Sequence, residues 1–238
     1  MNQPFPSDPD WIAFLLGIIF TTLGFTFYHF LNTLLIKPLR WKKTSLDDNV
    51  RNILLQRLSG VFIYGILPLI LFIFLIDEKT VSYYTGKISI ETLYWLLPIA
   101  VLVVILNYLN AGKRDNLDMY PEIRKTRWNS SLVFLSALSW ITYLLAYEFI
   151  FRGLLFIPAY KLFGFWPAVL INIGIYSLVH VPKGAKEGIG SIVLGFILCL
   201  LVVKTGSFWI AFFIHIVLAL SNEWFSIIKN PEIKLART

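Results

Sequence analysis

The chain has 238 residues, of which 57% are hydrophobic and 15% are charged, and its net charge is +7. A soluble domain has roughly 45–50% apolar and about 25% charged residues, so a water-soluble core would not hide this much apolar surface. The lysines and arginines stand between long apolar blocks, which indicates a membrane protein rather than a nucleic-acid-binding protein. Cys199 is the only cysteine, which excludes an intrachain disulfide and a cysteine-based metal site.

Seven apolar segments predict membrane-spanning helices, since a span needs about 20 residues and strands of a β-barrel would alternate apolar and polar residues. The segments are Trp11–Ile36, Leu58–Ile76, Leu93–Leu109, Leu132–Phe156, Phe165–Val181, Ile189–Val203 and Ser207–Ile228. The first is too long for the apolar part of a signal peptide, so we expect it to be retained. The predicted fold class is all-α, a polytopic transmembrane helical bundle of about seven spans.

Most lysines and arginines fall in the loops after the first, third and fifth segments and in the C-terminal tail. Because basic loops stay in the cytoplasm, this distribution predicts an N-terminus outside and a C-terminus in the cytoplasm. We expect three regions along the chain. Residues 1–130 form a three-span region with cytoplasmic basic loops, residues 131–228 form a core, and residues 229–238 form a cytoplasmic tail.

Ionisable side chains within the predicted spans mark a functional site, because placing a charge in hydrocarbon costs about 2.5–3.5 kcal/mol on insertion scales. In the fourth segment, Glu148 and Arg152 are four residues apart and therefore share one helix face. A buried ion pair that only fixes helix packing is the alternative interpretation of these two residues.

Two further spans carry polar residues at helical spacing. They are Asn172, Tyr176 and His180 in the fifth segment, and His215 with Asn222 in the last. Glu148 and His180 lie on helices on either side of the turn near Gly164. Both are at the same depth below this turn, roughly 21 Å at 1.5 Å per residue. His215 lies at a somewhat shallower level. These depths predict that Glu148, His180 and His215 form one cluster.

The same residues resemble the motifs of a known family. The stretch YEFIFRGLL, from Tyr147 to Leu155, resembles the E-E-x-x-x-R-G motif of the CPBP family. This family groups type II CAAX prenyl proteases with bacteriocin-processing and immunity proteins. Tyr176-x-x-x-His180 resembles its F-x-x-x-H motif, and His215 matches the histidine of its H-x-x-x-N motif. The resemblance covers about Leu132 to Trp224.

The resemblance implies an intramembrane peptidase. In the family, a glutamate and the first histidine are thought to hold and deprotonate water, while the second histidine and an asparagine stabilise the oxyanion. It implies catalytic roles for Glu148, His180 and His215, with Arg152 keeping the glutamate ionised. The residues expected to support them are Tyr147, Tyr176, Asn172 and Asn222.

Two positions depart from the family pattern. Tyr147 stands where the family has its first glutamate, and Ala219 stands where it has the asparagine. Tyrosine is a weak base at neutral pH and alanine donates no hydrogen bond. Three residues are candidates to replace the missing groups. Glu148 would replace the base, and the Tyr147 hydroxyl would replace the hydrogen-bond donor. Asn222 is another candidate donor, roughly 10 Å from His215 along the helix.

Three functions are open on this basis. The first is an endopeptidase that hydrolyses a peptide bond of a membrane-associated protein or peptide. A zinc-dependent form would use His180, His215 and Glu148 as ligands, although the chain has no H-E-x-x-H motif. The second is a catalytically degenerate scaffold or immunity factor. The third, a small-solute transporter, is disfavoured by the lack of repeats.

The expected partners are membrane lipid and a peptide or protein substrate, without nucleic acid. The family's distribution implies a bacterial cytoplasmic membrane.

Overall fold

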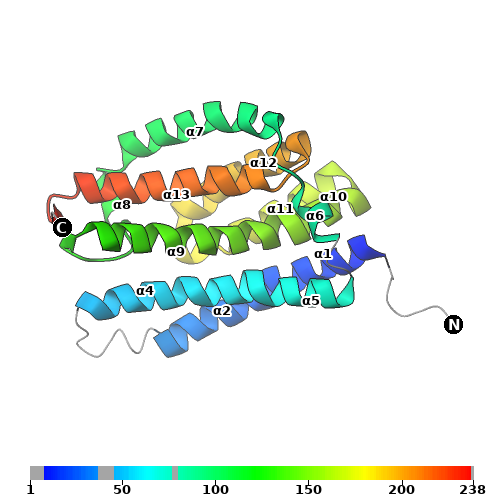
Figure 1. The fold of residues 1–238 in the computed structure, drawn as a ribbon, viewed down its shortest axis with the longest axis horizontal. Coiled ribbons are helices and arrows are strands. Elements are labelled where there is room, and N and C mark those ends of the chain that lie inside the picture. The colour runs from blue at the N-terminus through cyan, green and yellow to red at the C-terminus, as the bar shows by residue number, and fades with distance from the viewer. Residues whose placement is uncertain (1–7, 37–45, 77–79, 237–238) are drawn as a thin grey trace.

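The computed structural model describes residues 8–36, 46–76 and 80–236, and it is almost entirely helical (Figure 1). The elements in chain order are α1 (Pro9–Ile19), η1 (Phe20–Gly24), α2 (Phe25–Leu31), η2 (Asn32–Ile36), α4 (Leu46–Val61), η3 (Phe62–Ile66), α5 (Leu67–Leu75), α6 (Val81–Thr85), α7 (Ile90–Asn110), α8 (Arg114–Leu117), β1 (Arg127–Trp128), α9 (Ser130–Glu148), η5 (Phe149–Phe156), α10 (Ile157–Phe163), α11 (Phe165–Leu178), η6 (Val181–Lys183), α12 (Ala185–Thr205), α13 (Trp209–Lys229) and β2 (Lys234–Leu235). Elements η1, η2, η3 and η5 are π-helical, and η6 is a 3₁₀ turn.

Among the described residues, six helices are long and apolar enough to cross a membrane. They are Pro9–Leu34, Asp48–Leu75, Val81–Asn110, Ser130–Phe163, Ala185–Thr205 and Trp209–Lys229. The predicted all-α transmembrane bundle is therefore confirmed.

The fifth predicted segment differs from the other six. It forms α11, a helix of only 14 residues, because the chain turns into the 3₁₀ turn η6 that contains Pro182. Gly184 follows this turn with a φ of 111°, a conformation that favours glycine, and α12 starts directly after it.

The orientation of the chain in the membrane remains a prediction. Four of the basic loop residues on which it depends, Lys37, Arg40, Lys42 and Lys43, lie outside the described residues.

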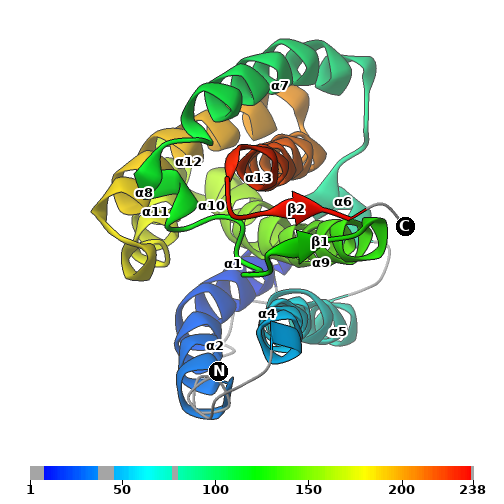
Figure 2. The ribbon, with the colours of Figure 1, turned by 90° about the vertical axis from the view of Figure 1, so that its left-hand side faces the viewer.

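The long helices stack in the order α7, α13, α9 and α4 (Figures 1 and 2). Helix α13 packs against both α7 and α9, and α9 also packs against α4. Helices α11 and α12 pack on each other, and α12 also packs against α13. The C-terminal helix is thus central in the bundle, with polar residues such as His215 and Glu223 buried along it.

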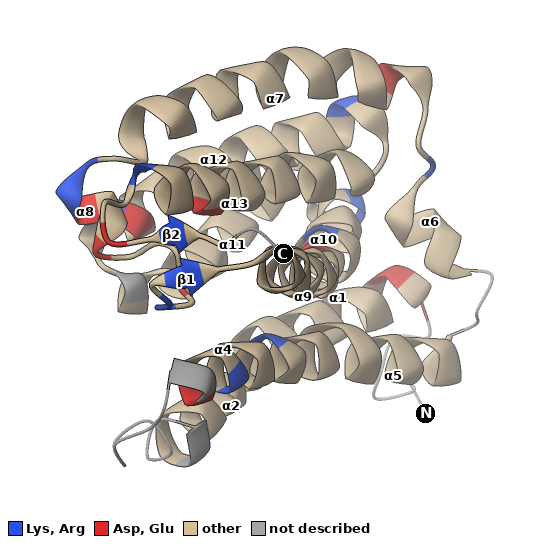
Figure 3. Cartoon of the chain, turned by 60° about the vertical axis from the view of Figure 1, so that its left-hand side comes forward, with Lys and Arg blue, Asp and Glu red and all other residues tan. Residues whose placement is uncertain are grey.

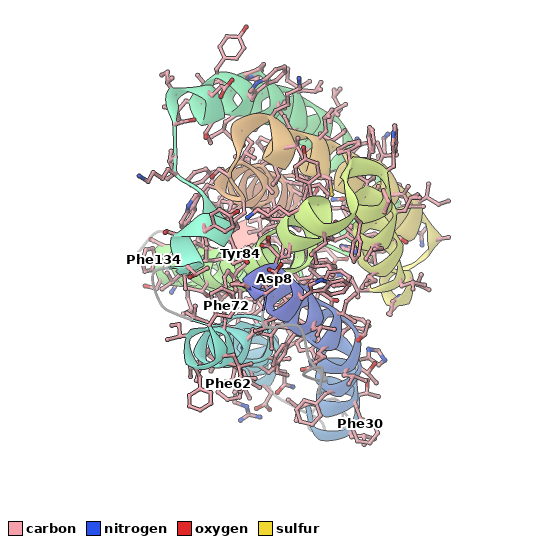
Figure 4. All side chains as sticks on the ribbon, turned by 90° about the vertical axis from the view of Figure 1, so that its right-hand side faces the viewer. Asp8, Phe30, Phe62, Phe72, Tyr84 and Phe134 are labelled. Carbon is pink, nitrogen blue, oxygen red and sulfur yellow. The ribbon has the colours of Figure 1, made fainter. Side chains whose placement is uncertain are left out.

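Apolar side chains cover the outside of the bundle as well as its interior. Phe30, Phe62 and Phe134 point outward and are each more than half exposed, whereas Phe72 and Tyr84 are fully buried (Figure 4). Soluble proteins rarely expose contiguous apolar surface of this extent, which a lipid environment would cover. The exterior therefore agrees with a protein embedded in a bilayer.

Charged residues gather at one end of the bundle, around α8, β1 and β2 and the start of α4 (Figure 3). Strands β1 and β2 pair in parallel there, with Arg127 opposite Lys234, and so attach the C-terminal segment to the loop before α9. The middle of the helices carries few charges, so each charged side chain found inside the bundle requires an explanation.

Helix α1 makes a very close contact with the segment that carries the polar site. A Cβ atom on Gly17 would lie 2.5 Å from the backbone oxygen of Leu154 in η5. The two backbones approach this closely because glycine has no side chain, as at other small-residue helix crossings in membranes.

We predict that Gly17→Ala destabilises the protein by about 1–3 kcal/mol, because the added methyl group must separate two backbones. Thermal unfolding in detergent would measure this change. Gly174→Ala is the matched control, since Gly174 also lies in a helix and a methyl group added there would meet no neighbouring element within 4 Å. The control should keep or raise stability, as alanine is the better helix former. Equal stability of both variants would contradict the predicted close packing.

Candidate active site

The centre of the bundle holds a fully buried carboxylate. Glu148 is the last residue of α9, and both it and Arg152 have 0% exposed surface. The Arg152 Nη1 atom lies 3.0 Å from Glu148 Oε2 and also donates to Oε1 at 3.2 Å. The guanidinium keeps the carboxylate charged inside the bundle, because an ionised group is stable there only when it is paired.

The ion pair lies where regular α-helix changes to π-helix. Segment η5 begins at Phe149, directly after Glu148, and contains Arg152. Such π-helical turns within helices occur frequently at functional sites. The helix-face prediction for Glu148 and Arg152 agrees with the observed contact, although the local helix is wider than the assumed α-helix.

The carboxylate also binds a histidine from the C-terminal helix. His215 Nδ1 lies 2.6 Å from Glu148 Oε1, across 67 positions of sequence. An ionised carboxylate only accepts hydrogen bonds, so Nδ1 carries the proton and donates it. The other ring nitrogen, Nε2, then has a lone pair in the neutral imidazole.

His180 has the same tautomer for a different reason. Its Nδ1 lies 2.7 Å from the backbone oxygen of Tyr176, which only accepts a hydrogen bond. The His180 ring also packs 4.6 Å from the Tyr176 ring. Both histidines therefore have Nε2 as the basic nitrogen.

Tyr147 lies next to both histidines. Its ring centroid is 5.8 Å from that of His215 and 6.2 Å from that of His180. The residue is 5% exposed, and its hydroxyl has no hydrogen-bond partner among the described residues. An unpartnered buried hydroxyl is unfavourable, and a bound group that accepts its hydrogen bond would remove this cost.

A cavity of about 550 Å³ adjoins these residues. Its wall includes Tyr147, Tyr176, His180, His215, Ala219 and Asn222. Glu148 and Arg152 do not line it. The histidines and the tyrosine are therefore accessible to a bound molecule, whereas the carboxylate lies behind them and acts on the cavity through His215.

Asn172 links the helices on the side of the site away from the cavity. Its Nδ2 donates to the backbone oxygen of Phe151 at 2.7 Å, and its Oδ1 accepts from the Cys199 thiol at 3.3 Å. The Arg152 guanidinium in turn stacks 4.4 Å from the Tyr176 ring centroid. Asn172 thus connects α11 and α12 to the π-helical segment and lies outside the cavity wall.

A second buried ionic network was missed from the sequence. Arg57 of α4 is 3% exposed and lies 3.1 Å from Glu122 and 3.4 Å from the fully buried Glu223. Glu223 also accepts a bond of 2.6 Å from the Trp140 indole and a short one from the Ser136 hydroxyl. The sequence did contain a sign of this network, because Glu223 is an acidic residue within the predicted span Ser207–Ile228.

The donor arrangement does not support the zinc alternative. Among the described residues, no three His, Cys, Asp or Glu side chains come together as a metal site. One oxygen of Glu148 accepts the His215 proton and the other lies 3.0 Å from the Arg152 guanidinium, whose positive charge disfavours a metal cation there.

The fold and the site define an intramembrane protein in which the buried His215 and the partly buried His180 line one cavity. Residues 128–221 match the family described as type II CAAX prenyl endopeptidase Rce1-like. This match confirms the resemblance predicted from the sequence motifs, over somewhat less than half of the chain, and it indicates a CAAX-protease-like intramembrane peptidase region. No curated protein and no solved structure is significantly similar to the chain.

We predict that Arg152→Leu destabilises the protein by about 3–5 kcal/mol, because it leaves the buried Glu148 carboxylate without its cation. The double variant Glu148→Gln/Arg152→Leu should regain part of this loss, since no uncompensated charge remains. Thermal unfolding in detergent would show the difference.

Lys186→Ala serves as the control for loss of an ion pair. Lys186 pairs with Asp115 at 3.8 Å, and both side chains are more than three-quarters exposed. An exposed pair contributes less than about 1 kcal/mol. A destabilisation by Arg152→Leu as small as that of the control would show that the carboxylate does not depend on the guanidinium.

Proposed function

We propose that the protein is an intramembrane endopeptidase that hydrolyses a peptide bond of a membrane-associated protein or peptide. The observation that carries this proposal is the 2.6 Å hydrogen bond from His215 to the buried Glu148, beside a cavity. A carboxylate that fixes one tautomer of a histidine is the arrangement by which hydrolases make imidazole an effective general base.

In this proposal Glu148 is a positioning residue and does not touch the attacking water. It is fully buried and lies behind the cavity wall, so His215 Nε2 is the base that reaches the water. The negative charge of Glu148 stabilises the imidazolium that forms when His215 takes the proton. Arg152 maintains that negative charge at 3.0 Å.

The reaction then follows ordinary peptide hydrolysis. The water oxygen forms a bond to the carbonyl carbon while His215 takes one water proton, which gives a tetrahedral oxyanion. Collapse of this intermediate breaks the C–N bond, and His215 returns the proton to the leaving amine. His180 Nε2 is the second acceptor on the wall and would orient the water through its other proton.

Tyr147 supplies the oxyanion donor in this scheme. Its buried hydroxyl has no partner among the described residues, and its ring lies next to both histidines. A donor aimed at a developing oxyanion is most effective in a site that excludes water. The tyrosine would therefore take over the donor function of the family asparagine, where this chain has Ala219.

The alternative is a binding scaffold or immunity factor without catalysis. It is favoured by Tyr147 and Ala219, both on the cavity wall at positions where the family has a glutamate and an asparagine. Such a protein would bind a membrane peptide in the same cavity without cleaving it.

We predict that the wild-type protein cleaves members of a quenched fluorescent peptide library, and that Glu148→Gln and His215→Ala each lower the rate by about 10²–10⁴-fold. The glutamine retains a hydrogen-bond acceptor but loses the charge that stabilises imidazolium. Lys186→Ala, at an exposed position, is the activity control. Full activity of either site variant would contradict the proposed base, and peptide binding without cleavage by wild type would favour the scaffold.

We predict separately that Tyr147→Phe lowers kcat by about 10²–10³-fold with little change in KM, because the hydroxyl acts only on the oxyanion. Tyr143→Phe is the matched control, since Tyr143 also lines the cavity and its ring centroid lies 5.9 Å from that of Tyr147. Equal kcat values for Tyr147→Phe and wild type would exclude Tyr147 as the donor.

A further inference from the structure

A second recess lies on the outer face of the bundle, between α4 and α9. It is a groove of about 600 Å³, and it shares no lining residue with the cavity that contains the histidines. Three of its leucines, Leu55, Leu58 and Leu135, are exposed and belong to helices that are long and apolar enough to cross a membrane. The groove is therefore open to the surroundings of the bundle and separate from the proposed active site.

The groove changes from polar to apolar along its length. Helices α4 and α9 both begin at the charged end of the bundle (Figure 3). On α4, Arg51 comes first, and Leu55 and Leu58 follow it into the bundle; on α9, Ser131 precedes Leu135. At 1.5 Å per residue, Leu58 lies roughly 10 Å further from this end than Arg51. A polar mouth is thus followed directly by an apolar floor.

The mouth of the groove is positively charged. Arg51, Lys125 and Arg127 line it, and none of the described lining residues is acidic. Arg51 pairs with Asp48 at 2.7 Å, and Lys125 takes part in a further interaction, so their charges are partly balanced. Arg127 forms no ion pair with a described residue. The mouth therefore keeps an excess of positive charge even without counting Arg51 and Lys125.

A second positive charge stands beside Arg127. Strands β1 and β2 pair with Arg127 opposite Lys234, and both residues are exposed. Side chains at paired positions lie on the same face of a sheet, and like charges there are unfavourable. Helix α9 starts three residues after Arg127, so its first N–H groups add partial positive charge at the same end. An anion bound at the mouth would offset this repulsion.

We propose that this groove binds an anionic phospholipid. The phosphate lies at the mouth beside Arg127 and Lys125, and one acyl chain follows Leu55, Leu58 and Leu135. A phospholipid matches both parts of the groove, because its headgroup is charged and its chain is apolar, and basic pockets between membrane helices bind such headgroups. The inference goes beyond the proposed peptidase function and does not depend on it.

Native mass spectrometry of the full-length protein in a neutral detergent tests the preference for an anionic headgroup. The probes are dioleoylphosphatidylglycerol and dioleoylphosphatidylcholine, which have the same chains, and titration gives Kd for the first bound lipid. We expect phosphatidylglycerol to bind at least about tenfold more tightly. Equal affinities for the two lipids would overturn the inference. Displacement of the lipid by an equal concentration of glycerol phosphate would also overturn it, because phosphate alone would then be recognised.

A matched pair of arginine variants assigns the preference to the groove. Arg127→Gln should reduce the ratio of the two Kd values at least about threefold. Arg114→Gln should leave the ratio unchanged, since Arg114 is exposed in α8, at the same end of the bundle but outside the groove wall. Both variants should unfold like wild type in lipid-free detergent, because both side chains are exposed. Equal reduction of the ratio by both would assign the preference to general surface charge and overturn the inference.

The apolar part of the groove has its own test. Leu55→Trp should fill the groove and weaken both lipids by the same factor, whereas Leu97→Trp, at an exposed position of α7 outside the groove, should weaken neither. A phosphatidylglycerol with a photoreactive diazirine in its acyl chain should label wild-type peptides within residues 50–58 or 129–135. Labelling confined to other segments would overturn the inference whatever the variants do.

Discussion

The structure depends on the charged carboxylate of Glu148 in the interior of a membrane protein. An ion in such surroundings is stable only when its charge is paired, and here Arg152 supplies the opposite charge and His215 a hydrogen bond. The arginine comes from the same helix one turn later. The histidine comes from α13, so the carboxylate also fixes how α13 packs against α9.

A second anchor joins the same two helices. Glu223 lies eight residues after His215, roughly 12 Å further along α13, and binds Ser136 and Trp140 of α9. Arg57 extends this network to α4. Two polar contacts at different levels prevent α13 from rotating or sliding against α9. The cavity between these helices and α11 therefore has fixed walls, as a site for directed chemistry requires.

The departures from the family motifs have a common structural consequence. With tyrosine at 147, an aromatic ring packs next to both histidines, and Glu148 lies behind His215, outside the cavity wall. With alanine at 219, the wall loses an amide donor. The motif positions present two imidazoles and the Tyr147 phenol to the cavity, so the proposed chemistry depends on histidine as the base.

The sequence by itself determined the class of molecule, the helical bundle and most of the polar site. Long apolar runs require lipid, and the Glu148–Arg152 contact is local, so composition and helical spacing were sufficient. Only the tertiary structure decided that Glu148 binds His215 across 67 positions, that Glu223 meets Arg57, and that α11 is a short helix. The physical reason is that helix rotation and depth follow from packing between distant segments, which spacing along one helix does not specify.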